Sequence, residues 1–209
     1  MPDGDAKAIR KGRKFDAVLD AARGLFLEHG FEATSVDEIA RLAGVSKATL
    51  YSYFPDKSLL FLEVAKVELL RQADLILTGD NLDLPVREFL SGFGYGMLDF
   101  LTSRFGLSLF RVCVAESARF PDLGRQFMES GPMMVEDCLI RFIDAAAERG
   151  ELVCDDGRLA AAQFAELCKA GVHSRILMGT LDELTPEVRA RVIDGAVETF
   201  LARYGAPEA

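Results

Sequence analysis

The chain has 209 residues, half of them apolar, and a formal net charge of −9 at pH 7. This length allows one large domain, or one small domain joined to a larger one. The sequence has no continuous apolar run of the ~18 to 20 residues that a membrane span needs, and no apolar secretory leader at its N-terminus. We therefore expect a cytoplasmic protein without a membrane partner.

Helical periodicity is sustained along the sequence and strand alternation is not, so the predicted fold is all-α. The first predicted helix runs from about Ile9 to His29, with Gly30 after it as a suitable end residue. The predicted fourth helix runs from Asp56 to about Thr78. The later predicted helices are Pro85–Ser103, Leu107–Ala118, Pro121–Glu129, Pro132–Arg149, Asp156–Met178 and Pro186–Tyr204.

Two short helices lie between the first and fourth. Ser35 followed by Glu38 forms a capping box, which predicts a helix that begins at Val36 and ends at Ala43. Gly44 then breaks the pattern, and Ser46 can cap a third helix over Lys47–Tyr53. Two short helices joined by a tight glycine turn indicate a helix-turn-helix.

The third helix shows a division between its faces. At 100° per residue, Leu50 and Phe54 share one face, which we expect to pack on the preceding helix. The opposite face is small and polar around Ala48 and Ser52, as a helix in a DNA major groove requires. The alternative is an ordinary surface helix with half-buried tyrosines, which the preceding capped helix and glycine turn make less favourable.

Charge is distributed unevenly. The first 66 residues are close to electrically balanced, and nearly all of the net negative charge follows them. Residues 6–15, AKAIRKGRKF, hold five basic residues and no acidic one. Such an arm suits phosphate binding, although a solvated tail remains an alternative.

The run from Thr34 to Leu60, TSVDEIARLAGVSKATLYSYFPDKSLL, resembles the DNA-binding domain of TetR-family transcriptional regulators. The resemblance is strong over about residues 10–65. It implies an N-terminal three-helix helix-turn-helix domain, placed at residues 1–66, and a helical ligand-binding and dimerisation domain at residues 67–209. It also implies a homodimer on a palindromic double-stranded operator.

Carried over by position, the resemblance and the helix geometry give one set of DNA-binding residues. Tyr51 and Tyr53 are expected on phosphates, and base reading is expected from Lys47, Ala48, Thr49 and Ser52. The full set is Thr34, Ser35, Ser46, Lys47, Ala48, Thr49, Tyr51, Ser52, Tyr53 and Lys57.

The rear half is similar to the AefR-like subgroup of the same family, on the segments Glu116–Leu123, Phe127 with Gly131-Pro132, and Gly150–Leu152. The subgroup implies a helical domain that binds a small effector. Aromatic and methionine residues there suit an apolar or aromatic ligand, although plain core is the alternative for each one. The predicted pocket residues are Phe93, Met97, Phe100, Phe110, Met133, Phe142, Phe164 and His173.

The last two predicted helices are apolar over wide arcs, which indicates a second partner for each. The family implies that they form a four-helix dimer interface; burial within one chain is the alternative. The predicted interface residues are Phe164, Cys168, Gly171, Val188, Val192, Ala196 and Phe200.

Other chemistry has little support in the sequence. The four cysteines, at positions 113, 138, 154 and 168, form no Cys-x-x-Cys pair, and we expect reduced, packed thiols, with a redox-sensing pair left open. His29 and His173 have no partner at ligand spacing, so neither a metal nor another cofactor is predicted.

The sequence therefore predicts a ligand-responsive DNA-binding regulator. A repressor that is released by its effector is the leading interpretation, and an activator is left open. Two alternatives are a helical enzyme, which no nucleophile–base pair or phosphate loop supports, and a sensing or scaffold protein that no longer binds DNA. The effector, the operator and the regulated genes are not encoded in any recognisable pattern.

Overall fold

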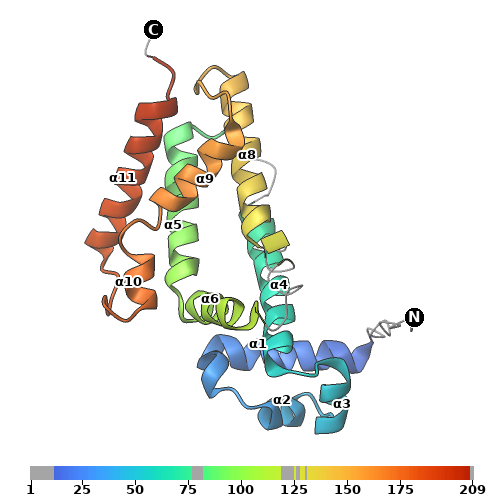
Figure 1. The fold of residues 1–209 in the computed structure, drawn as a ribbon. Helices are drawn as coiled ribbons and strands as arrows, with labels where there is room; N and C mark the ends of the chain where they lie inside the picture. Colours follow the sequence, from blue (N-terminus) through green and yellow to red (C-terminus); the bar gives the residue numbers. More distant parts are fainter. Residues whose placement is uncertain (1–11, 77–81, 119–124, 126–127, 130, 208–209) are drawn as a thin grey trace.

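The computed structural model describes residues 12–76, 82–118, 125, 128, 129 and 131–207, with residues 69–76 described by their backbone alone. The all-α prediction is confirmed, and Figure 1 shows the helices. Their bounds are α1 (Arg13–Ala33), α2 (Val36–Leu42), α3 (Lys47–Tyr53), α4 (Lys57–Ile76), α5 (Val86–Thr102), α6 (Arg104–Glu116), α8 (Pro132–Glu148), α9 (Gly157–Leu167), α10 (His173–Leu177) and α11 (Pro186–Tyr204).

The described residues form two hydrophobic cores. One lies among α5, α8, α9 and α11 and is called the rear core; Leu90, Phe142 and Phe164 are among its fully buried large side chains. The other is called the front core, and it joins α1–α4 around Phe26 and Phe61. In Figure 1, α1–α3 lie at one end of the molecule and α11 leads to the C-terminus at the other.

Helix α6 belongs to the front core, although it follows α5 in the chain. Phe105, Leu109 and Val112 are buried among residues of α1 and α4, and the Phe61 and Phe105 rings are 5.3 Å apart. The predicted boundary after residue 66 falls inside α4, which is continuous there. The front core therefore includes α4 and α6, and part of it comes from residues beyond the predicted boundary.

The predicted helix Asp156–Met178 is wrong in one respect, because it is two helices. Helix α9 ends at Leu167, and α10 begins at His173. Gly171 between them has φ +73°, a left-handed conformation that other residues adopt at a cost. Most of the predicted helix Pro121–Glu129 lies outside the described residues.

The four cysteines are free thiols, and three of them are buried. Burial raises the pKa of Cys113 and of Cys168 to about 12, so both are protonated at neutral pH. Each therefore behaves as a small apolar side chain in its core.

Gly106 permits the tight connection between α5 and α6. A Cβ at this position would lie 2.1 Å from the carbonyl oxygen of Phe100, which is backbone and has little freedom to move. Gly96, in contrast, is exposed in the middle of α5, and a Cβ there would meet nothing within 4 Å.

We predict opposite effects for alanine at these two glycines. Gly106→Ala should lower the free energy of unfolding by about 1–3 kcal/mol or more, because the turn must open to relieve the contact. Gly96→Ala should raise it by about 0.5–1 kcal/mol, because a helical glycine is replaced without strain. Urea unfolding of both variants measures this, and equal effects would contradict the tight-turn assignment.

Candidate DNA-binding surface

Helices α2 and α3 form the predicted helix-turn-helix from local signals. The Ser35 hydroxyl accepts a hydrogen bond from the Glu38 amide at 3.1 Å and so caps α2. The Ser46 hydroxyl caps α3 by accepting from the Thr49 amide, also at 3.1 Å. Gly44 has φ +64° in the turn between them. Both predicted caps are confirmed, and they fix where each helix begins.

The inner face of α3 holds it to the domain. Leu50 and Phe54 are buried, and the Phe54 ring stacks on Phe15 of α1 with centroids 5.2 Å apart. This face points inward as expected, but the partner shown for the Phe54 ring is α1 and not the preceding helix that was predicted. This packing orients the remaining α3 side chains away from the core.

The outer face of α3 is small and polar. Lys47, Ala48 and Ser52 are exposed, and Thr49 is half-buried. The Thr49 and Ser46 hydroxyl oxygens are 2.8 Å apart, and the Ser52 hydroxyl donates to the Thr49 carbonyl at 2.6 Å. These contacts fix the hydroxyl positions before any ligand binds.

The two tyrosines differ in environment. Tyr51 is 42% exposed, whereas Tyr53 is half-buried with its ring edge-on to Phe15 at 5.7 Å. Tyr53 thus packs its ring on the domain, and Tyr51 stands further into solvent.

Thr34 was predicted among the DNA contacts; that role stays a prediction, and in the structure its side chain is turned inward. Thr34 is only 2% exposed, and its hydroxyl donates to the Gly30 carbonyl at 2.8 Å. Gly30 interrupts α1 with φ +81° and ψ 174°, which leaves its carbonyl outside the helical pattern. The buried Thr34 side chain therefore stabilises the α1–α2 connection through this hydrogen bond.

Lys57 makes intramolecular contacts with the same connection. Its ammonium donates to the carbonyls of Phe31 at 2.8 Å and Thr34 at 3.1 Å, and it lies 4.2 Å from the centroid of the Phe31 ring. A role in DNA contact stays a prediction for Lys57. Its contacts in the structure hold the start of α4 against the α1–α2 connection.

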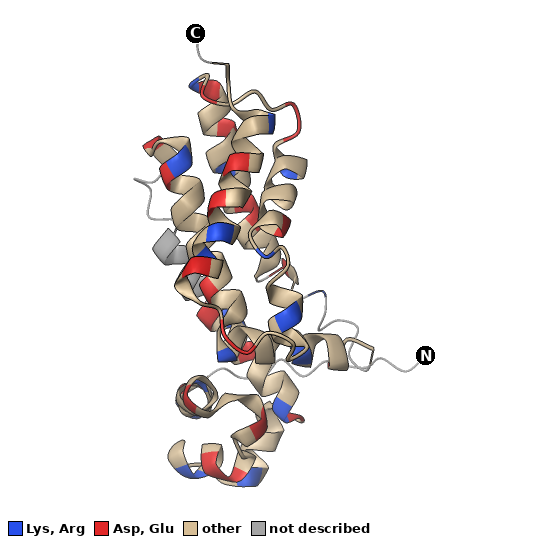
Figure 2. Cartoon of the chain, turned by 90° about the vertical axis from the view of Figure 1, so that its left-hand side faces the viewer, with Lys and Arg blue, Asp and Glu red and all other residues tan. Residues whose placement is uncertain are grey.

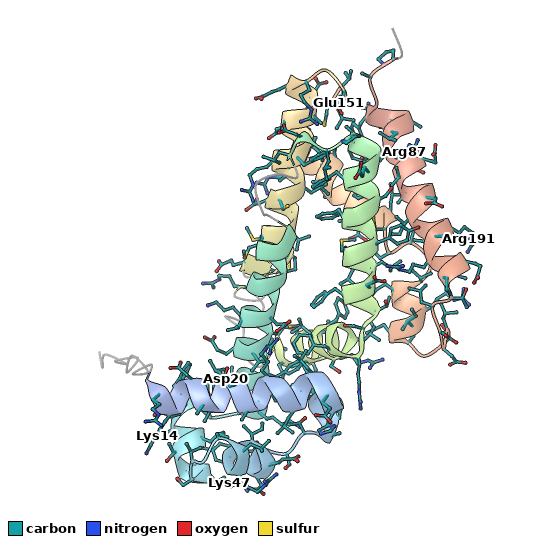
Figure 3. The ribbon with its side chains drawn as sticks, turned by 180° about the vertical axis from the view of Figure 1, so that it is seen from behind. Lys14, Asp20, Lys47, Arg87, Glu151 and Arg191 are labelled. Atoms are coloured by element: carbon teal, nitrogen blue, oxygen red, sulfur yellow. The ribbon has the colours of Figure 1, made fainter. Side chains whose placement is uncertain are left out.

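Lys47 is the only basic residue among the seven of α3, and it is also paired. Its ammonium lies 2.7 Å from the Asp37 carboxylate on α2. This hydrogen bond raises the pKa of Lys47. Figure 3 shows Lys47 at the end of the molecule formed by α1–α3, and Figure 2 shows acidic and basic segments mixed there. The sequence analysis did not single out Asp37, although its position two residues after the Ser35 cap could be read from the sequence.

The predicted pocket residues of the rear half lie in different environments. Phe93, Phe142 and Phe164 are buried in the rear core; Met97 and Phe100 are half-buried; Phe110 and Met133 are exposed. His173 is 8% exposed, and its ring meets Phe110 edge-on at 5.4 Å. Burial lowers the pKa of His173, which favours the neutral imidazole.

The predicted dimer residues divide into buried and accessible ones. Phe164, Cys168, Ala196 and Phe200 are buried within the protomer and offer little surface to a second chain, so their place in an interface stays a prediction. Val188 and Val192 are half-buried and Gly171 is exposed. A largely apolar surface groove of about 660 Å³ runs between α9 and α11, lined by Ala162, Gln163, Glu166, Leu167, Ala170, Thr199, Phe200, Arg203 and Tyr204.

Within the described residues, no cluster of three or more His, Cys, Asp or Glu side chains is arranged to hold a metal ion. In the same part of the chain, none of the helices has the length and apolar character needed to cross a membrane.

We predict that Lys57→Met lowers the free energy of unfolding by about 1.5–3 kcal/mol, because two carbonyls lose a charged donor. Lys66→Met, the same change further along α4, is the control and should have little effect. Thermal and urea unfolding measure both. A fully stable Lys57→Met that loses only DNA affinity would contradict the structural role.

Comparison with known proteins agrees with this geometry. A family model described as bacterial regulatory proteins of the tetR family matches residues 18–64. A second model, described as the C-terminal domain of AefR-like transcriptional repressors, matches residues 88–206.

Individual relatives match either the front part or the whole chain. The transcriptional regulator RutR of Escherichia coli is 45% identical over 61 residues, which are 29% of this chain and 28% of RutR. A structure described as a TetR-family regulator from Mesorhizobium loti has a TM-score of 0.77 and 29% identity, covering 93% of this chain and 98% of its own. The structure of the flavonoid-responsive regulator FrrA has a TM-score of 0.66 and 38% identity, covering 95% of this chain and all (100%) of its own.

One family model spans more than half of the chain, and the helix-turn-helix lies within the other. The chain therefore belongs to the TetR family of DNA-binding transcriptional regulators.

Proposed function

We propose that this protein is a cytoplasmic, homodimeric repressor that binds a palindromic operator and is released by a small aromatic effector. The proposal rests on the difference between the two faces of α3, one buried and apolar, the other exposed, small and polar. Leu50 and Phe54 fix the helix to the front core, and its exposed face is small enough to enter a major groove. The match to the AefR-like repressor domain supports repression over activation.

Base reading is assigned to the exposed face of α3. Ala48 and the Thr49 methyl suit thymine methyl groups, and the Lys47 ammonium suits guanine acceptors. Tyr51 and Ser46 suit phosphate oxygens, which position the helix without specifying sequence. The fixed hydroxyls of Ser46, Thr49 and Ser52 support this assignment because they need no rearrangement on binding.

The groove between α9 and α11 supports a dimer. Its floor is apolar, and small or flexible side chains such as Ala162, Ala170 and Thr199 line it, so a second helix pair could approach closely. In a symmetric dimer the same patch meets its own copy. Two recognition helices would then read half-sites about one DNA turn apart, ~34–36 Å.

An aromatic effector is supported by two observations. FrrA, which is 38% identical over nearly the whole chain, is described as responsive to flavonoids. His173 is buried, and its Nε2 has no hydrogen-bond partner among the described residues. An unsatisfied buried nitrogen costs about 1–3 kcal/mol, which a ligand hydroxyl would remove. His173 is therefore our choice for the polar anchor of the effector.

Helix α6 connects this anchor to the DNA-binding end. The Phe110 ring contacts His173, and the Arg111 guanidinium donates to the Leu177 carbonyl of α10 at 2.8 Å. The opposite face of α6 is buried in the front core through Leu109 and Val112. A ligand that displaces α10 would move α6, and with it the spacing of the two recognition helices.

Selection from a random duplex library tests the operator proposal. The wild-type chain should enrich an inverted repeat whose half-site centres lie about one helical turn apart. Sedimentation should give twice the protomer mass of 22.9 kDa. Enrichment of no sequence over random DNA would contradict the proposal and favour a protein whose helix-turn-helix no longer binds DNA.

We predict different defects for two α3 variants on the selected DNA. Tyr51→Ala should weaken binding to all sequences about equally, because a phosphate contact is lost. Thr49→Ala should change the preferred base at one position in each half-site, with discrimination altered by about 1–3 kcal/mol. Fluorescence anisotropy on a panel of single-base operator variants measures both, and equal losses everywhere for Thr49→Ala would refute the division.

We predict that His173→Phe abolishes most of the thermal stabilisation produced by a hydroxylated flavonoid such as naringenin. Phenylalanine keeps a ring against Phe110 but offers no hydrogen-bonding nitrogen, so the fold should be retained. The unhydroxylated parent, flavanone, is the ligand control and should stabilise both proteins weakly. A full naringenin shift in His173→Phe would rule out the anchor; absence of any shift in the wild type would count against a flavonoid-like effector.

A further inference from the structure

The contact between Asp37 and Lys47 joins the two helices of the helix-turn-helix on their outer side. The ammonium and the carboxylate oxygen are 2.7 Å apart, and the side chains are 53% and 71% exposed. An ion pair this exposed contributes little to stability, because water and salt screen both charges. The location of this ion pair, on the surface that is proposed to face DNA, is therefore more informative than its contribution to stability.

The pair changes what the surface offers to a phosphate. Lys47 is the only cation of α3, and in the structure its charge is opposed by a carboxylate at hydrogen-bond distance. The other lysine predicted to contact DNA, Lys57, donates to two backbone carbonyls. Both lysines therefore have partners within the protein before DNA binds. Non-specific affinity for DNA depends on free cations that replace counterions on the phosphates, so these partners limit it.

We propose that Asp37 is a specificity-determining residue, which holds Lys47 away from the phosphodiester backbone of non-cognate duplex DNA. On a cognate site, the base contacts of α3 bring Lys47 to the DNA and compensate for loss of the ion pair. On other sequences those contacts are missing, and Lys47 stays with Asp37. This inference rests on the proposed operator binding, and it assigns to an acidic residue the suppression of unwanted binding.

Asp37→Asn tests the proposal on a random-sequence duplex of about 30 base pairs, by fluorescence anisotropy across a salt series. Asparagine keeps the shape of the side chain and removes its charge. We expect binding up to about fivefold tighter than in the wild type near physiological salt, because the gain from releasing Lys47 is limited to the strength of an exposed ion pair. The slope of log affinity against log salt should steepen by about 0.9, as expected for one additional phosphate contact.

Glu38→Gln is the matched control. It removes one negative charge from the same turn of α2, but Glu38 has no ion pair with Lys47 among the described contacts. A gain that came only from net charge would be equal in the two variants, and that result would overturn the proposal.

Lys47→Gln completes the test as a double-mutant cycle. The gain produced by Asp37→Asn should disappear in the Lys47→Gln background, because Lys47 is the cation that the loss of the ion pair releases. Additive effects would contradict the coupling. Asp37→Asn that loses affinity and changes base preference on the selected operator would instead make Asp37 a direct base reader, and would overturn the proposal.

These outcomes are separate from the failure of the proposed function. The key measurement uses random DNA and needs no operator. A wild-type chain that enriches no sequence contradicts the operator proposal, whatever the affinity of Asp37→Asn for random duplex.

Discussion

The burial of α6 in the front core is the constraint on which the rest of the structure depends. Phe105, Leu109 and Val112 complete a core that α1–α4 leave open around Phe61. Without α6 this face of the DNA-binding unit would expose a large apolar surface, which isolated domains rarely do. The DNA-binding end is therefore not an independent unit attached by α4, and any displacement of α6 acts on its packing.

The recognition surface depends on this core through short local contacts. The caps at Ser35 and Ser46 fix the beginnings of α2 and α3, and the Phe15–Phe54 stack fixes the orientation of α3. The connection before α2 is closed by Thr34 from within and by Lys57 from α4. These polar groups are therefore already bonded to one another, and Lys47 and Lys57 both have partners within the protein.

Local signals in the sequence predicted the elements well. The capping box, the glycine turn and the spacing of Leu50 and Phe54 depend only on neighbouring residues, and the structure agrees with all three. Residues whose role depends on distant contacts were not predictable in this way. Thr34 is polar and precedes a helix, as a surface residue would, but the chain reversal at Gly30 encloses it. Helix α6 was predicted from its period, whereas its membership of the front core depends on contacts with α1 and α4.

The last two predicted helices, which are apolar over wide arcs, show the same limit of prediction from local sequence patterns. Apolar residues on two faces of a helix indicate two partners, but the pattern does not say which face meets the protomer and which meets another chain. Phe164 and Phe200 face the rear core, and the groove is lined in part by less apolar neighbours such as Ala162 and Thr199. In the same way, the periodicity across Gly171 predicted one continuous helix where the structure has α9 and α10.

Hydrogen exchange of a Leu109→Ala variant tests the shared role of α6 most directly. Leu109 is 2% exposed, and its truncation should cost about 2–5 kcal/mol. If α6 completes the DNA-binding core, mass spectrometry should show faster amide exchange in α1 and the first turns of α4 as well as in α6. Faster exchange confined to α6, or extending only into α5 and the rear core, would contradict the account.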